Sequence, residues 1–289
     1  MCSMITDILD YIIALITGYS RGQRVLLDRS LVDLLGSLWW TLGPVSYKIH
    51  DPKVIANFEQ LCLDTLDREV FANLHNNPKL LDSVTKMVME RLNIDEKYLH
   101  LVEDAVLQIS KHLYHLAVFD KTISVQVDEE TEAHRKLLDE LWTSLETRPL
   151  PESYSVSHSV DATDKTTSSW GVLGFQMPLT DFRRTGLLGL QCLNYMATNF
   201  PEKSKEALEA SNDAKLWFPF AVTSINVTSW VLDYWNTSKL GAFSYNNDRP
   251  PLETFYIIHS FVFFEFINFW RLSDAKSILE FKEVSLKLL

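Results

Sequence analysis

The sequence predicts an all-α protein, a compact multi-helix domain, from three observations. Apolar residues recur three and four positions apart over most of the 289 residues, which is the spacing of one helical face. Proline breaks such as Asn77-Pro78 separate these periodic stretches. The chain is 46% hydrophobic and 12% aromatic, which is enough for a sizeable core and too apolar for a disordered chain.

The first half of the chain contains a series of helical patterns. They cover residues 4–19, 26–42, 53–74, 79–92 and 96–120. Pro52 falls at the first turn of the third pattern, where a missing N–H group does no harm. Asp95 precedes the fifth pattern and is expected to cap it. Residues 122–128 alternate between polar and apolar, so they could form a short strand or an extended linker.

The pattern over residues 4–19 has two interpretations. Its apolar face would dock on the core, whereas the alternative is an interfacial contact with a membrane or a partner. Asp7 and Asp10 stand where a secretory signal would be basic, and the stretch is too short to span a bilayer. We therefore expect no targeting segment here.

The second half combines a long loop with further helical patterns. The helices are expected over residues 130–147, 184–200, 203–211, 214–238, 252–271 and 274–287. Residues 148–169 are rich in serine and threonine and carry two prolines, which is typical of a surface loop. His259, Glu265 and Asn268 interrupt the apolar segment 254–270, which favours a central core helix over a membrane span.

Charge and cysteine content exclude several classes of function. The net charge is −11 and the pI is about 5.2, so nucleic-acid binding is disfavoured because phosphate contacts need clustered lysine and arginine. Generic attraction to anionic lipid is disfavoured for the same reason. Cys2, Cys62 and Cys192 are too few and too widely spaced for a disulfide framework or an ordinary zinc site. They are typical of a reducing compartment, and we expect a cytoplasmic protein.

Motifs of the common enzyme classes are missing from the sequence. It contains no Walker loop, no GxGxxG, no HExxH and no GxSxG. His112 and His115 are the closest useful histidine pair, but no acidic residue completes a ligand set. We therefore expect ordinary histidines on a helix surface.

The stretch that begins at Trp170 combines residues with separate physical tasks. Trp170 and Phe175 can fix a loop to a core by their apolar bulk. Gly174 allows a close approach or a positive φ, and Pro178 pre-sets one turn.

The same stretch then leads into the next helix. Thr180 or Asp181 can cap that helix with a side-chain oxygen. Gly186 and Gly189 leave room for close helix packing. Together these features would hold Arg183 rigidly on an exposed turn.

An arginine held in this way has two interpretations. It can deliver a planar charge into the phosphate site of another protein, and an arginine supplied in trans accelerates GTP hydrolysis by roughly 10³–10⁵. Alternatively, Arg183 pairs with Asp181 or a helix carboxylate and only orders the loop. The residues by themselves leave both interpretations open.

At this stretch the sequence resembles the ELMO domain family, specifically the ELMOD-type (ELMO domain-containing) proteins. The family pattern is approximately W-x3-GFQ, an acidic spacer, P-x-TDFRG and a Gly-Leu-Leu-rich helix. Here it stands as Trp170, Gly174-Phe175-Gln176, Pro178, Thr180-Asp181-Phe182-Arg183 and Gly186-Leu187-Leu188. The likeness continues upstream in "HRKLLDELWTSL" and downstream in "WFPFAVTSINVTSWVLDYW", "FYIIHSFVFFEFINFW" and "ILEFKEV".

The resemblance implies an all-α domain of ELMO type over residues 126–289, with residues 1–125 as an N-terminal helical region packed on it. It further implies a GTPase-activating protein (GAP) for an Arf-family or Arf-like small GTPase, with Arg183 as the required arginine. GTP and Mg²⁺ would belong to the partner, and no cofactor or metal of its own is implied. The alternative is a non-catalytic binding or scaffold module that regulates small-GTPase assemblies.

The resemblance also assigns supporting residues and a location. The residues implied to support the motif or to bind the partner are Trp170, Gly174, Phe175, Gln176, Pro178, Thr180, Asp181, Arg184 and Gly186. A cytoplasmic location is expected, with peripheral association with internal membranes through the N-terminal helix as an alternative.

Two positions depart from the family pattern. Met177 alone separates Gln176 from Pro178, where the family usually has three residues, and a shorter spacer could displace Arg183 by several ångströms. Arg184 stands where the family has glycine, and it would be strained if that position required a positive φ.

Overall fold

The structure is a computed structural model that describes residues 52–64, 67–146, 148–151, 153–154, 169–213, 217–236, 244 and 249–272. The helices expected over residues 4–19, 26–42 and 274–287 lie outside the described residues, as does most of the expected loop over residues 148–169. The described residues form helices and turns without a strand, which confirms the all-α prediction.

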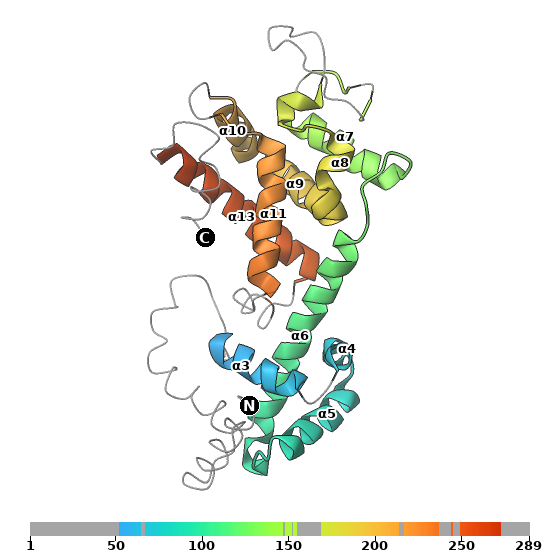
Figure 1. Ribbon diagram of the computed structural model, residues 1–289, viewed down its shortest axis with the longest axis vertical. Helices are drawn as coiled ribbons and strands as arrows, with labels where there is room; N and C mark the ends of the chain where they lie inside the picture. The colour runs from blue at the N-terminus through green and yellow to red at the C-terminus, as the bar shows by residue number, and fades with distance from the viewer. Residues whose placement is uncertain are drawn as a thin grey trace, which may run out of the picture. The chain divides into compact units, whose positions relative to one another are not determined.

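The helices are labelled in Figure 1. Their bounds are α3 (Pro52–Leu63), α4 (Arg68–Ala72), α5 (Pro78–Arg91), α6 (Leu99–Ile123), α7 (Glu132–Leu145), α8 (Pro178–Asp181), α9 (Gly186–Asn199), α10 (Pro201–Ser211), α11 (Phe220–Asn236) and α13 (Pro251–Leu272). Short 3₁₀ helices lie between them: η3 (Leu74–Asn76), η4 (Glu96–Tyr98), η5 (Trp170–Leu173) and η6 (Phe182–Arg184).

Local signals set the helix ends in the first part of the described chain. Pro78 opens α5, and the Asn77 side chain accepts a backbone N–H group of its first turn at 3.2 Å. Asp95 accepts a backbone N–H group of η4 at 3.1 Å, so the expected cap is confirmed directly before α6. The single helix expected over residues 53–74 is instead two helices, because Asp67 starts α4 with a side-chain cap at 3.0 Å.

The chain divides into two compact units. Unit 1 comprises residues 1–117 and 235–248, and unit 2 comprises residues 118–234 and 249–289. In unit 1, apolar side chains of the described helices form a core that includes Phe58, Phe71, Leu74, Val88, Val102, Ile109 and Leu113.

Unit 1 also buries its histidine pair. His112 is fully buried and His115 is 4% exposed, so the expectation of surface histidines is wrong. Burial lowers the pKa of His112 to about 3 and that of His115 to about 4, which keeps both rings neutral. The Oγ atom of Ser244 lies 3.4 Å from Nδ1 of His112 and accepts the indole N–H of Trp235 at 3.0 Å. The pair therefore belongs to a polar part of the core.

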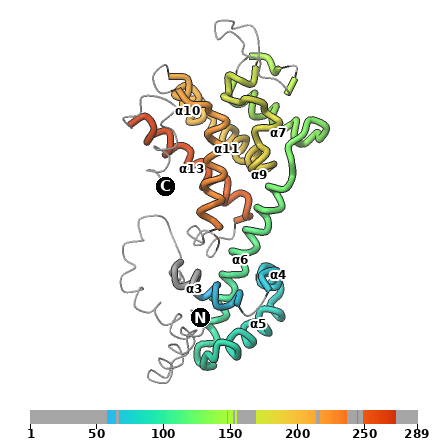
Figure 2. The backbone as a smooth tube through the Cα atoms, in the orientation of Figure 1, coloured from blue at the N-terminus to red at the C-terminus, as the bar shows by residue number. Residues whose placement is uncertain are grey.

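Unit 2 is organised around α9. This helix packs against α7, α10 and α13, which can be followed beside it in Figures 1 and 2. The amide of Asn194 in α9 donates to the Leu137 carbonyl in α7 at 2.8 Å. The Tyr256 hydroxyl of α13 donates to Gln191 of α9 at 2.9 Å. These bonds fix the helix that begins at Gly186.

The core helix predicted for residues 252–271 is α13. Among the described residues it is the helix that is long and apolar enough, by length and composition, to cross a membrane. Its Phe263, Phe266 and Trp270 are nevertheless fully buried within unit 2. The ring of Phe263 meets Phe220 of α11 edge-on, with 5.2 Å between ring centroids. One face of α13 therefore forms part of the aromatic core.

The residues that follow α6 form a linker and not a strand. α6 ends at Ile123, and α7 begins at Glu132. The carbonyl of Val125 accepts the backbone N–H of Leu187 at 2.8 Å. The linker therefore lies against the first turn of α9, next to the candidate site.

Candidate functional site

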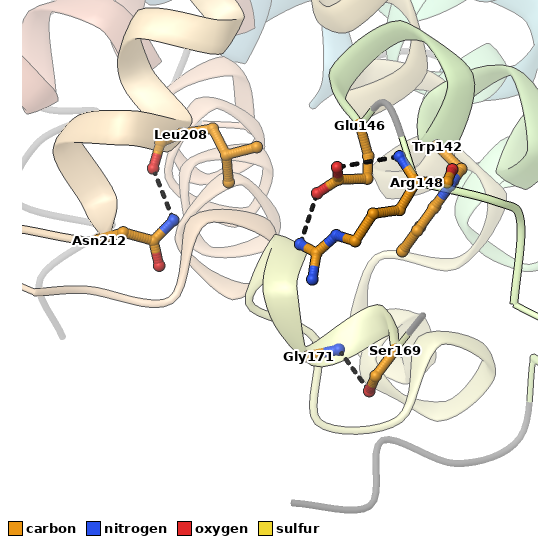
Figure 3. A network of polar contacts seen from close by, with 7 residues as sticks. All are labelled: Trp142, Glu146, Arg148, Ser169, Gly171, Leu208 and Asn212. Carbon is orange, nitrogen blue, oxygen red and sulfur yellow. Dashed lines mark hydrogen bonds and ion pairs between the residues drawn. The ribbon is translucent and has the colours of Figure 1, made fainter. Parts of the chain in front are cut away.

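Trp170 fixes the start of the candidate stretch to α7. Its ring is fully buried and meets the ring of Trp142 edge-on, with 5.2 Å between centroids. Its indole N–H donates to the Ser153 carbonyl at 3.1 Å. The Ser169 hydroxyl caps η5 by accepting the N–H of Gly171 at 3.3 Å, as Figure 3 shows. Trp170 therefore has the anchoring position expected from the sequence.

A row of aromatic rings continues from Trp170 to the residue before Arg183. Phe175 lies 5.8 Å from Trp170, and Phe182 lies 5.7 Å from Phe175, both measured between ring centroids. Phe175 is 3% exposed and Phe182 is 1% exposed. We call Trp142, Trp170, Phe175 and Phe182 the aromatic row. It connects α7 to the backbone that carries Arg183.

Gly174 adopts a backbone conformation in this stretch that favours glycine. It has a φ of +80°, in the left-handed region, and ends η5. A Cβ atom on Gly174 would lie 2.7 Å from the carbonyl carbon of Pro219 and would also collide with the Phe220 amide. Both reasons that the sequence suggested for glycine therefore apply here, the positive φ and the close approach.

The side chain of Asp181 bonds to the preceding loop and not to the following helix. Its Oδ2 atom accepts the N–H of Gln176 at 2.8 Å and the N–H of Met177 at 3.2 Å. The Thr180 hydroxyl donates to the Met177 carbonyl at 3.4 Å. The expected cap is wrong for both residues, because η6 separates them from α9, whose cap position is Thr185 without a side-chain hydrogen bond.

In this turn glycine is required at position 186 and not at position 184, which Arg184 occupies. Gly186 has a φ of +52°, and a Cβ atom there would lie 2.7 Å from the Val125 carbonyl oxygen. Arg184 lies in η6, and its φ is not positive. The sequence predicted strain at Arg184 if this position required a positive φ. It does not, so that strain is absent. A Cβ atom on Gly189 would collide with Thr185, in line with the expected close packing.

Arg183 and Arg184 are both exposed at the end of η6. The Nη1 atom of Arg183 donates to the Thr180 carbonyl at 3.4 Å, which is a long hydrogen bond. Within the described part of the chain neither arginine forms an ion pair, so the alternative pairing of Arg183 with Asp181 is not formed. The arrangement can therefore present a guanidinium to a phosphate or carboxylate of another molecule.

Metal-ligating and nucleophilic side chains form no further candidate site among the described residues. No group of three or more histidine, cysteine or acidic side chains there could hold a metal ion. Cys62 and Cys192 are buried, and burial raises the pKa of both thiols, which keeps them protonated and unreactive.

Two parts of the site were missed from the sequence. Phe182 completes the aromatic row, and its position as a single apolar residue between Asp181 and Arg183 could have indicated that it is buried. The backward bonds of Asp181 resemble a capping box, since an acidic side chain near the helix start accepts the N–H of the cap residue Met177. Asp181 lies four residues after Met177, one more than in a capping box, so the usual capping-box spacing does not indicate this bond.

Comparisons with known proteins identify the family of this chain. The sequence model of the ELMO/CED-12 family matches residues 117–285. ELMO domain-containing protein B of Dictyostelium discoideum is 34% identical over 167 residues, which are 57% of this chain and 54% of that protein. ELMO domain-containing protein 2 of Mus musculus is 29% identical over 211 residues, which are 70% of this chain and 68% of that protein.

A third relative is less similar in sequence, and the chain matches only part of each relative's length. ELMO domain-containing protein 1 of Bos taurus is 25% identical over 227 residues, which are 71% of this chain and 66% of that protein. The chain thus spans between about half and two thirds of the length of these relatives. No solved structure matches the chain.

Proposed function

The chain belongs to the ELMO/CED-12 family, and on that premise we propose that it is a GTPase-activating protein for an Arf-family or Arf-like small GTPase. In this proposal Arg183 is supplied in trans to the GTP phosphates. The observation that carries it is the state of Arg183: its turn is fixed, its guanidinium is exposed, and no carboxylate of the described residues pairs with it.

The chemistry of GTP hydrolysis explains why such an arginine is useful. Water attacks the γ-phosphorus, the bond to the bridging oxygen breaks, and negative charge develops on the oxygens around the reacting phosphorus. A guanidinium placed against these oxygens stabilises the transition state and contributes roughly 10³–10⁵ in rate. The aromatic row holds the backbone next to Arg183, so little ordering is required when the GTPase binds.

The partner supplies the rest of the reaction in this proposal. GTP, Mg²⁺ and the attacking water belong to the GTPase, and this chain contributes no cofactor. Supporting positions are those of the aromatic row, the loop from Gln176 to Asp181, and Gly186, which together determine where Arg183 stands. We further propose that the protein acts in the cytoplasm, with residues 4–19 as a candidate contact with internal membranes.

A single-turnover hydrolysis assay tests the proposal. GTP-loaded Arf and Arf-like GTPases are mixed with increasing amounts of the full chain, and phosphate release is followed. We expect at least one GTPase to hydrolyse GTP faster, with the maximal stimulation lost in Arg183→Ala. Arg183→Lys should also lose most of it, because lysine lacks the planar fork that contacts two oxygens at once. Arg271→Ala removes another exposed arginine of unit 2 and serves as the matched control.

Two outcomes would contradict the proposal. The first is that no GTPase in the panel is stimulated by the wild-type chain. The second is that Arg183→Ala stimulates as well as the wild type. If a GTPase is bound in a pull-down by the wild type and by Arg183→Ala alike without stimulation, the scaffold function is the better assignment.

A further inference from the structure

We propose that Asp181 is a positioning residue for Arg183, an inference that rests on the GTPase-activating function proposed above. Its carboxylate closes the loop from Gln176 to Asp181, and the closed loop fixes the carbonyl that the Arg183 guanidinium contacts. Asp181 touches neither the GTPase nor the nucleotide in this proposal. It acts on Arg183 through the backbone.

The loop closure depends on one carboxylate oxygen. Oδ2 of Asp181 accepts the N–H groups of Gln176 at 2.8 Å and Met177 at 3.2 Å, so it bonds two consecutive amides. Hydrogen bonds to an ionised acceptor are stronger than those to a neutral one. Pro178 follows and has no N–H group, so it donates no backbone hydrogen bond to this loop.

A continuous series of bonds leads from Asp181 to Arg183. The Met177 amide is held by Asp181, and the Met177 carbonyl accepts the N–H groups of Thr180 at 3.0 Å and Asp181 at 2.9 Å. The Thr180 carbonyl in turn accepts the guanidinium of Arg183. Phe182 is buried independently by the aromatic row. Loss of the carboxylate should therefore displace the Arg183 guanidinium more than it disturbs the fold.

The same bonds explain why Asp181 and Arg183 do not pair although one residue separates them. The Oδ2 atom of Asp181 faces the two amides of the loop. The acid thereby orders the turn and leaves the Arg183 charge available to a partner. A carboxylate that paired with Arg183 would instead have neutralised its charge and occupied the guanidinium.

The test measures the stimulated hydrolysis rate as a function of the concentration of the full chain. For Asp181→Ala we expect a maximal rate roughly 10- to 100-fold lower, because a displacement of about 1 Å at a reacting group has effects of this size. The half-saturating concentration should change by less than about threefold, since the binding surface is kept. Asp181→Asn keeps an acceptor oxygen and should retain activity within about fivefold of the wild type. Asp233→Ala, at an exposed position of α11, is the matched control.

Several outcomes would overturn the proposal. One is an unchanged maximal rate in Asp181→Ala. Another is an Asp181→Asn variant as inactive as Asp181→Ala, which would mean that charge and not loop closure matters. A loss of rate that only follows the folded fraction, measured by circular dichroism, would assign Asp181 a purely structural role.

A second measurement separates this proposal from the GTPase-activating function. Amide hydrogen exchange and the NMR order parameter of the Arg183 Nε–H group are recorded on the full chain without a GTPase. We expect protected Gln176 and Met177 amides and an ordered Arg183 in the wild type and Asp181→Asn, and the loss of both in Asp181→Ala. If no GTPase is stimulated but these differences are found, only the GTPase-activating function fails. If the two amides exchange like unprotected ones in the wild type, the positioning role is wrong whatever the hydrolysis assay shows.

Discussion

Two arginines of unit 2, Arg148 and Arg183, lie in opposite environments. The Arg148 guanidinium donates to Oε2 of Glu146 at 2.6 Å, and its backbone N–H donates to Oε1 at 3.2 Å, as Figure 3 shows. The Arg148 side chain is 29% exposed and that of Glu146 is 14% exposed. Arg183 is exposed, and among the described residues its guanidinium has one long bond, to a carbonyl.

The difference shows that one unit can fix an arginine in two ways. The Arg148 side chain is ordered by an ion pair with Glu146. The backbone carbonyl of Arg148 accepts the indole N–H of Trp142 at 2.9 Å. At Arg183 the backbone is ordered by Asp181 and the neighbouring Phe182, while no carboxylate in the described part of the chain pairs with the charge. A paired arginine must break its ion pair before it can contact a phosphate, and an unpaired one need not. The comparison therefore favours a structural role for Arg148, and the function proposed above gives Arg183 an intermolecular one.

The largest expected effect is at Trp170, which lies between the two regions. Its ring contacts Trp142 on one side and Phe175 on the other. Trp170→Ala should lower the free energy of unfolding by about 3–5 kcal/mol, as for other buried aromatic rings. Urea unfolding followed by circular dichroism measures this. Trp217→Ala, at a ring that is 49% exposed, should cost less than about 1 kcal/mol. Equal costs for both variants would mean that Trp170 does not join the two regions.

Gly186→Ala should have the next largest effect, at the turn that carries Arg183. The added Cβ atom would collide with the linker at Val125 and would require a positive φ from alanine. We expect a loss of about 2–4 kcal/mol in the free energy of unfolding. Gly171→Ala in η5 is the control, since Gly171 is exposed and should tolerate the methyl group. A Gly186→Ala variant as stable as Gly171→Ala would contradict the described geometry of the turn.

Acid should weaken unit 2 through the buried His259 of α13. Burial lowers the pKa of His259 to about 4, from an ordinary value of about 6.5 in the unfolded chain. The unfolded state therefore binds more protons between these values. The stability is fully present above pH 6.5 and falls as the pH drops towards 4. From pH 7 to pH 5 we expect a loss of about 2 kcal/mol from this histidine. The difference between the unfolding curves of the wild type and His259→Gln at each pH measures it, and an identical slope in both would refute it.

Arg148→Ala should have a moderate effect on stability and none on stimulation. It leaves the carboxylate of Glu146, which is 14% exposed, without its guanidinium partner. We expect a loss of about 1–2 kcal/mol in the free energy of unfolding. The stimulation of GTP hydrolysis per folded molecule should equal that of the wild type. A loss of stimulation at full folding would show that the two arginines are not separated in role.

The sequence predicted the helices better than the bonds around the site. Apolar periodicity located α9 and α13 to within a few residues. Each helix buries one face, and the apolar residues of that face recur at helical spacing. For Gly174 the sequence indicated a close approach or a positive φ, and the structure shows both. The backward bonds of Asp181 and the burial of His112 were not predicted, because both depend on which backbone or side-chain groups approach in space.

Arg183→Ala should have the smallest effect on stability. Its side chain is exposed and makes one long hydrogen bond to the described residues, so we expect a change within about 0.5 kcal/mol in the free energy of unfolding. The same variant should lose the stimulation of GTP hydrolysis, which is the reverse of the pattern expected for Arg148→Ala. Urea unfolding and single-turnover hydrolysis on the same preparations measure both properties. If Arg183→Ala costs as much stability as Arg148→Ala, the Arg183 side chain orders its own loop. Arg183 would then be a structural arginine like Arg148, and the exposed charge would be no sign of a partner.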